Sequence, residues 1–256
     1  MSSFRTLFAL FVLMTLAIPA IAAEEKDVAT QAVTGEKAAG LTYGASVQVL
    51  SKYVSRGAVV SDDPVLQPDL WVTYGDLTFG VWNNIDLTDY EVAPWRVTET
   101  DWYFEYGFSV PKAELTVGYF YYTYPNLHVD DTQEVYAKAA FDFVLSPELA
   151  VYYDIDEIGG IYANAAVSYA VPTGLESGGE GVTAKFGALV GYGDSNYIGG
   201  CFDHTGSSLV DLVLSCEVPV KLAANVTLTP AVAYMHVLDD DLRECTDISD
   251  ALYGGI

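Results

Sequence analysis

Basic residues are scarce in this chain. Lys and Arg together number 11 against 35 Asp and Glu, which gives a formal net charge of −24. Removing the predicted leader described below takes away Arg5 and no acid, so the remainder carries 10 bases against 35 acids, or −25. Such a charge disfavours nucleic acids and other anionic partners. It indicates either solvated acidic loops or a negative field that concentrates cations.

Signatures of catalysis are also lacking. The three histidines, His128, His204 and His236, lie in separate segments, and no Gly-x-Ser-x-Gly, His-Glu-x-x-His or phosphate-loop motif occurs. We therefore expect no enzyme activity, no catalytic residue and no cofactor. Asp203-His204 is better explained as a solvated loop pair. The acidic loop with Asp239, Asp240, Asp241, Glu244 and Asp247 could hold a divalent cation, but it lacks the spacing and Gly of a calcium loop, which favours a solvated loop without metal.

Long apolar runs are confined to the N-terminus. Arg5 precedes the apolar run Leu7 to Ile18, and Pro19-Ala20-Ile21-Ala22-Ala23 supplies a helix break and small residues. This pattern predicts a cleaved signal peptide over 1–23, with a signal anchor as the alternative. No later stretch approaches 18 apolar residues, so the exported product is either soluble or a barrel. Residues 24–40 are polar and aperiodic, which is typical of a mobile tail.

What the chain has instead is alternation with a period of two. Hydrophobic residues make up 51% and charged residues only 18%, spread over short segments rich in Tyr, Val, Ala and Gly. In the segment 99–110, Trp102, Phe104 and Phe108 share one face while Asp101 and Glu105 share the other. Such alternation is the signature of an all-β, antiparallel up-and-down transmembrane β-barrel, here over 41–256. A soluble β-sandwich is the alternative. The twelve predicted strands cover 41–56, 65–75, 77–88, 99–110, 113–124, 133–144, 148–157, 161–171, 182–193, 209–221, 226–238 and 251–256.

The connections between these strands alternate in length. Gly75-Asp76, Pro111-Lys112 and Ser146-Pro147 read as tight turns, whereas 57–64, 89–98, 125–132, 194–208 and 239–250 are long and acidic. Short periplasmic turns and long outer loops are the expected polarity of an outer-membrane barrel. Two connections fit less well, because 172–181 is long for a turn and Gly159-Gly160 is short for a loop. The last segment, 251–256, is about half a strand, which we interpret as a truncated end.

Particular motifs resemble a known family. They are Tyr53-Val54-Ser55-Arg56-Gly57, Ser61-Asp62-Asp63-Pro64 with Gln67, Phe79 to Asn84, Val117-Gly118-Tyr119 with Tyr121-Tyr122 to Pro125, and Glu134 to Ala137. Over about 41–171 the chain is similar to the outer-membrane porins of the TorF type. The resemblance implies an outer-membrane barrel with a pore-like role, and it carries over no catalytic residues. Small scaffolding barrels resembling the MltA-interacting type are the alternative relatives.

The alternation also predicts which side chains face the lumen. Acids outnumber bases among them, so we expect a porin-like channel for passive diffusion of small cationic or neutral solutes, located in the cell outer membrane. Its partners would be outer-membrane lipid and lipopolysaccharide, the small solutes, and the barrel-assembly machinery. The alternatives are an interior network of ion pairs and a non-conducting barrel that acts as an envelope anchor or scaffold. We expect Arg56 to pair with Asp62 or Asp86. The predicted pore-lining residues are Lys52, Arg56, Asp69, Asn84, Asp86, Asp101, Glu105, Glu114, Glu134, Lys138, Asp142, Asp154, Asp156 and Lys185, followed by Asp211, Glu217 and Lys221.

Only three cysteines are present. Cys201 and Cys245 fall in long outer loops, and an exported protein meets an oxidising compartment. We therefore predict a disulfide between Cys201 and Cys245. Cys216 lies on the apolar face of its segment with Leu212 and Leu214 and is expected to remain a free thiol.

Overall fold

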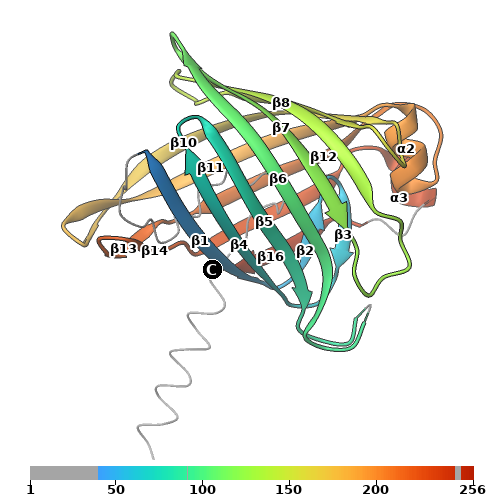
Figure 1. The fold of residues 1–256 in the computed structure, drawn as a ribbon, viewed down its shortest axis with the longest axis horizontal. Coiled ribbons are helices and arrows are strands. Elements are labelled where there is room, and N and C mark those ends of the chain that lie inside the picture. Colours follow the sequence, from blue (N-terminus) through green and yellow to red (C-terminus); the bar gives the residue numbers. More distant parts are fainter. Residues whose placement is uncertain (1–39, 91, 246–248) are drawn as a thin grey trace, which may run out of the picture.

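The computed structural model describes residues 40–90, 92–245 and 249–256. These residues form a closed antiparallel barrel of 12 strands (Figure 1), which confirms the fold class predicted from the alternation. The predicted leader, 1–23, and all of the predicted tail, 24–40, except Gly40 lie outside the described residues.

Neighbouring wall strands follow one another in sequence, as in an up-and-down barrel. Two further hairpins and two short helices lie in the connections; of the helices that the structure describes, none is long and apolar enough to cross a membrane. The wall contains β1 (Leu41–Leu50), β4 (Val65–Tyr74), β5 (Leu77–Asp86), β6 (Arg96–Val110), β7 (Ala113–Thr123), β8 (Thr132–Phe141), β9 (Glu148–Asp154), β10 (Ile161–Ser177), β11 (Glu180–Gly193), β12 (Ser208–Glu217), β15 (Ala231–Val237) and β16 (Ala251–Gly255). The other elements are β2 (Tyr53–Ser55) with β3 (Ala58–Ser61), β13 (Val220–Ala223) with β14 (Val226–Leu228), α2 (Ser195–Phe202) and α3 (Asp240–Cys245).

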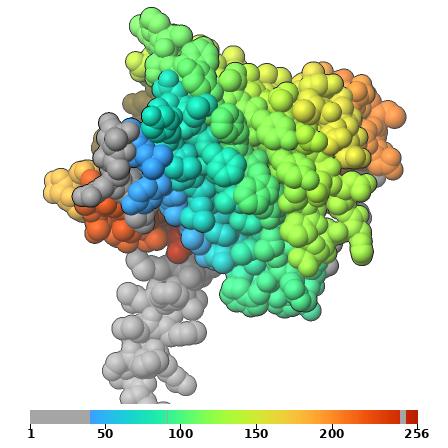
Figure 2. Space-filling view, in the orientation of Figure 1, coloured from blue at the N-terminus to red at the C-terminus, as the bar shows by residue number. Residues whose placement is uncertain are grey.

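The two faces of the wall differ in chemistry. Successive side chains of a strand point to opposite faces, so Leu70 is 56% exposed on the outside while Asp69 beside it is 9% exposed on the inside. Exposed apolar and buried polar side chains alternate in the same way on other wall strands such as β5, β8 and β9. Side chains of neighbouring strands pack into a continuous outer surface on the side seen in Figure 2. The exposed apolar side chains include Tyr43, Val47, Phe79, Trp102, Phe104, Phe108, Val117, Leu149, Val151, Val167, Tyr169, Phe186 and Leu214.

The two ends of the barrel differ in their connections. The tight-turn end carries the short turns after β4, β6, β8 and β10, together with the longer connection from β12 to β15, which contains the hairpin of β13 and β14. The long-loop end carries the other connections. The predicted strands 209–221 and 226–238 are therefore too long, because the wall pairing ends at Glu217 and resumes at Ala231.

The predicted connection 172–181 is not a loop. β10 extends as far as Ser177 and β11 begins at Glu180. Gly178 and Gly179, both with positive φ (60° and 81°), make the turn between them. Glycine adopts this backbone conformation without steric cost, which is why the turn can be so short.

The barrel closes through its last residues. β16 has five residues, pairs with β15 over its whole length, and meets β1 at the pair Leu50 and Gly255. Val49 and Ile256 exchange both backbone hydrogen bonds, at 2.8 and 3.2 Å. The short last strand therefore still joins the two edges of the sheet.

Glycines on the inner face make room for aromatic rings of the adjacent strand. In three cross-strand pairs, a Cβ added to the glycine would lie only 2.1–2.3 Å from the opposite ring. Each ring therefore covers the backbone of its neighbour, an arrangement that only glycine permits. The pairs are Gly44 with Trp71, Gly80 with Tyr103, and Gly118 with Tyr136.

Candidate functional site

The hairpin of β2 and β3 folds into the lumen from the long-loop end (Figure 1). Tyr53 and Val54 are buried in the core cluster, and the ring of Tyr53 lies 5.6 Å from that of Trp82 on β5. On the opposite side, a Cβ at Gly57 would lie 2.4 Å from Val210 on β12. The hairpin thus contacts the wall on opposite sides and fills this part of the lumen. Sequence analysis had assigned 53–56 to the first wall strand and 57–64 to an outer loop, and both assignments are wrong.

A two-residue turn sets the direction of the hairpin's charged tip. Arg56 and Gly57 have φ values of 39° and 87°, so both central residues are left-handed, as in a type I′ turn. The Tyr197 hydroxyl of α2 donates to the backbone oxygen of Arg56 at 3.4 Å. The backbone of the turn is therefore held by α2, while the Arg56 side chain projects toward β8, β9 and β10.

The guanidinium of Arg56 contacts the carboxylate of Glu134 and the faces of two tyrosine rings. Its two terminal nitrogens donate to Glu134 Oε2 and Oε1 at 2.6 and 3.0 Å, a bidentate pair. Its central carbon lies 4.1 Å from the ring centre of Tyr152 and 5.1 Å from that of Tyr162. The side chains of Arg56 and Glu134 are only 10% and 6% exposed. The partner expected from the sequence was Asp62 or Asp86, whereas the structure pairs Asp62 with Lys52.

Acidic groups dominate the interior. Of the residues that the structure describes, eight buried side chains are carboxylates, and the base that lies among them, Arg56, is nearly buried, with its side chain 10% exposed. Burying charge is costly unless hydrogen bonds and counter-charges surround it, so these groups sit in a polar network. Asn84, for example, accepts from Gln67 at 2.9 Å and donates to Asp86 and Thr98 at 3.1 and 2.7 Å. The eight are Asp69, Asp86, Glu99, Asp101, Glu134, Asp154, Asp211 and Glu217.

Aromatic side chains form a row along the inner wall. From Tyr103 through Phe120, Tyr136, Tyr152 and Tyr162 to Tyr197, successive ring centres lie 5.1–6.3 Å apart. Sequence analysis predicts a barrel rich in tyrosine but not this row. In the sequence these aromatic residues look like any other inward-facing strand positions. Whether they pack together or line a water-filled lumen depends on the hairpin of β2 and β3, which the sequence pattern does not predict.

The predicted pore-lining residues divide into three groups. The buried members, inside the lumen, are Asp69, Asn84, Asp86, Asp101, Glu134, Asp154, Asp211 and Glu217. Half-buried Glu105, Lys138 and Lys185 lie on the wall nearer the tight-turn end, and Lys185 pairs with Glu217 at 3.2 Å.

The third group lies at the margins. Asp142 and Asp156 are exposed beyond the last residues of β8 and β9 rather than on the lumen wall, because both strands end earlier than expected. Glu114 is exposed and accepts a hydrogen bond from Ser109 at 2.6 Å. Lys221 belongs to β13 and pairs with Glu180 rather than facing the lumen.

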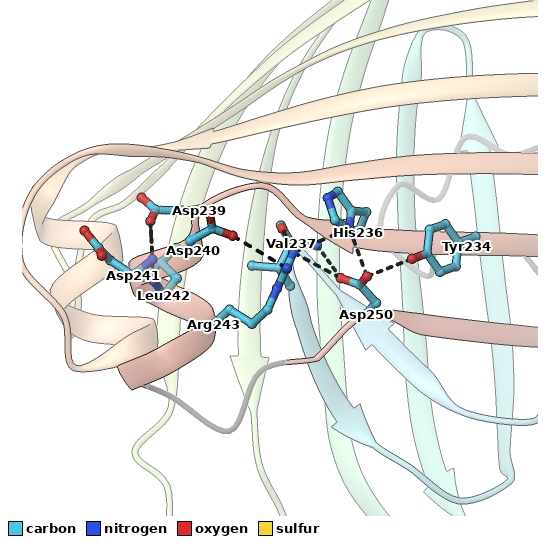
Figure 3. Close-up of polar contacts among 9 residues, drawn as sticks. All are labelled: Tyr234, His236, Val237, Asp239, Asp240, Asp241, Leu242, Arg243 and Asp250. Carbon is cyan, nitrogen blue, oxygen red and sulfur yellow. Dashed lines mark hydrogen bonds and ion pairs between the residues drawn. The ribbon is translucent and has the colours of Figure 1, made fainter.

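A second polar cluster surrounds Asp250 at the long-loop end (Figure 3). Its carboxylate accepts from the Tyr234 hydroxyl at 2.7 Å and the Val237 amide at 3.1 Å, and it contacts His236 Nδ1 at 2.9 Å. Arg243 of α3 lies 3.5 Å away. Burial alone would raise the pKa of Asp250, but the hydrogen bonds from His236, Tyr234 and Val237 outweigh it and lower this pKa to about 2.

This cluster predicts a dependence on pH. Because the folded-state pKa of Asp250 lies below its ordinary value of 3.8, its contribution to stability is complete above pH 4 and is lost as the pH falls toward 2. The protection factor of the Val237 amide, which is its exchange rate relative to the intrinsic rate at the same pH, should therefore fall over this interval in the native protein. In Asp250→Asn this protection should already be low at pH 5 and change little further; an unaltered profile would contradict the assignment.

The acidic loop that sequence analysis weighed as a cation site has another arrangement. Asp239 Oδ1 accepts from the backbone amides of Asp241 and Leu242 at 2.9 and 3.4 Å, capping α3 (Figure 3). The hydrogen bond from Ser208 is the main cause that lowers the pKa of Asp239. Within the described part of the chain, no group of three or more His, Cys, Asp or Glu could hold a metal ion.

The predicted disulfide concerns the two helices of the long-loop end. Cys201 lies in α2 and is exposed, while α3 ends at Cys245, whose side chain lies outside the described residues. Both helices occupy the same end of the barrel (Figure 1). Peptide mapping without reductant should find Cys201 linked to Cys245 and Cys216 alkylated. Alkylation of all three thiols, or a bridge to Cys216, would contradict this prediction.

No family model matches the chain, and comparisons with curated proteins and with solved structures find no match either.

Proposed function

We propose that this chain is an outer-membrane β-barrel that acts as a porin-like channel for passive diffusion of small cationic or neutral solutes. The observation that carries the proposal is the inversion of the usual arrangement of a protein: apolar side chains cover the outside, while eight carboxylates are buried inside. A soluble protein buries its apolar side chains, whereas a membrane barrel exposes them to lipid and keeps a polar lumen.

The location follows from the outer face. Trp102, Phe104 and Phe108 on β6, like Leu70 on β4, are exposed to whatever surrounds the barrel. Outer-membrane lipid and lipopolysaccharide are the environment that such a belt suits, and barrels of this kind require an assembly machinery. The resemblance to TorF-type porins supports the same location.

The acidic interior supports selectivity for cations. Fields of fixed carboxylates raise the local concentration of cations and repel anions. In the conformation described here the hairpin of β2 and β3 fills the lumen at the long-loop end, so we propose that conduction requires the hairpin to be displaced.

The second candidate is a non-conducting barrel that anchors or scaffolds envelope machinery. The observation that favours it is the tight packing of the hairpin, with Tyr53 and Val54 5% and 2% exposed. A barrel with a permanently filled lumen would act only through its loops and turns.

Planar-bilayer recording of the native protein and of a hairpin deletion separates the two candidates. Leu50 and Val65 are directly opposite in the pairing of β1 and β4, so a short Asn-Gly turn can replace residues 52–63 without disturbing the wall. We expect higher conductance from the deletion variant, with potassium favoured over chloride. Neutralising Asp86, Asp101 and Glu105 together should reduce this preference, and so should high salt, because the screening length is about 8 Å at physiological ionic strength.

Each alternative outcome has a defined meaning. Preference for chloride would refute the electrostatic part of the proposal. Silence of both proteins, with folding verified by slower migration after boiling, would favour the anchoring role.

A further inference from the structure

The place occupied by the Arg56 guanidinium is built by the wall and not by the hairpin. Glu134 belongs to β8, Tyr152 to β9 and Tyr162 to β10, all strands of the closed barrel. Together with Glu134, the two tyrosine rings define what we name the guanidinium seat. Arg56 reaches it from a separate two-stranded sheet.

The wall holds these three side chains in position by its own contacts. The Tyr122 hydroxyl donates to Glu134 Oε1 at 2.9 Å, which orients the carboxylate from the neighbouring strand. The ring of Tyr152 stacks on that of Tyr136 at 5.3 Å, and the Tyr162 hydroxyl donates to Asp211 at 3.2 Å. The seat should therefore persist when the hairpin is withdrawn.

The chemistry of the seat matches a planar cation. A carboxylate that accepts two parallel N–H bonds suits the fork of a guanidinium, and tyrosine faces attract its delocalised charge. A primary ammonium is a point charge and cannot make the bidentate contact. A neutral ureido group has a similar shape, but it lacks the charge that both Glu134 and the rings require.

We infer that the guanidinium seat is a binding site for small solutes that carry a guanidinium group, and that Arg56 is its built-in competitor. The inference deepens the proposed function, since such a solute would have to enter the lumen. An internal side chain occupies the seat at high effective concentration, so a free ligand gains access only when Arg56 leaves or is removed.

Binding of L-arginine to the full chain in detergent micelles, measured by calorimetry, tests the inference. We expect saturable binding to Arg56→Ala and binding weaker by more than about tenfold to the native protein. L-citrulline, the neutral ureido analogue, and L-lysine, the ammonium analogue, should bind Arg56→Ala more weakly than L-arginine by a similar factor. Adding Glu134→Gln to Arg56→Ala should strongly reduce the preference for L-arginine, because only the tyrosine faces then favour the cation.

A second variant guards against misfolding of the first. The hairpin deletion described above leaves Glu134, Tyr152 and Tyr162 in place and should bind L-arginine as Arg56→Ala does. Absence of saturable L-arginine binding to a folded deletion variant, or equal binding of L-arginine and L-citrulline, would overturn the inference. The measurement needs no conductance, so a silent barrel that binds L-arginine would refute the channel alone, and a conducting barrel that does not bind it would refute only the seat.

Discussion

Glu134→Ala should weaken docking of the hairpin by about 3–5 kcal/mol, because it removes the bidentate carboxylate partner of the nearly buried Arg56 guanidinium. The two side chains are 10% and 6% exposed, so water cannot replace the lost partner. The faces of Tyr152 and Tyr162 remain beside Arg56 and recover a fraction of this loss. Faster proteolysis within the hairpin and a lower unfolding temperature of the detergent-solubilised protein would report the change.

A second ion pair on the same hairpin provides the control. Lys52 and Asp62 form a pair whose side chains are 27% and 57% exposed. Exposed pairs contribute at most about 1 kcal/mol, so Lys52→Ala should leave docking nearly unchanged. If the two variants were equally affected, the distinction between a buried and an exposed pair would be wrong.

Phe104→Arg on the outer face should cost about 2–4 kcal/mol if β6 crosses a bilayer near its middle at this residue. Phe104 is 47% exposed, which in water would make the substitution nearly neutral. The expected penalty therefore comes from the lipid and not from packing. It can be measured as the free energy of folding into vesicles by urea titration.

The adjacent residue is the matched control. Glu105 faces inward and accepts a hydrogen bond from the Tyr136 hydroxyl, so Glu105→Ala removes one polar contact, worth about 1 kcal/mol. Similar costs at the two positions would mean that the outer face does not contact lipid or that the register of β6 is shifted.

Alternation was sufficient to predict a barrel of twelve strands and the face of each strand that points outward. In β6, Trp102 and Phe104 could only face the opposite side from Asp101 and Glu105, because successive side chains of a strand diverge. Strand ends were less certain, as Asp142 and Asp156 illustrate, since the period continues past the last backbone pair of β8 and β9. The alternation of apolar and polar residues does not indicate at which residue the backbone pairing between two strands ends.

The site was predicted only in part, for a related reason. Residues 53–56 read as the continuation of the first strand and 57–64 as a loop, and nothing in the local pattern of apolar and polar residues indicates that they form a hairpin folded into the lumen. The Arg56-Gly57 turn was the available signal, since a glycine at this point permits a left-handed hairpin turn. The partner of Arg56 lies 78 residues away, and such a contact follows from barrel closure and not from local sequence.

The fit of glycine against ring in three strand pairs bears on how the barrel assembles. Gly44 of β1 faces Trp71 of β4, Gly80 of β5 faces Tyr103 of β6, and Gly118 of β7 faces Tyr136 of β8. Sliding one strand by two residues would preserve the inside and outside faces, so hydrophobicity alone cannot forbid it. Such a shift would, however, replace the glycine opposite each aromatic ring by a residue with a Cβ, which would clash with the ring. Each pair thus disfavours the neighbouring registers sterically, even before the sheet has closed into a barrel.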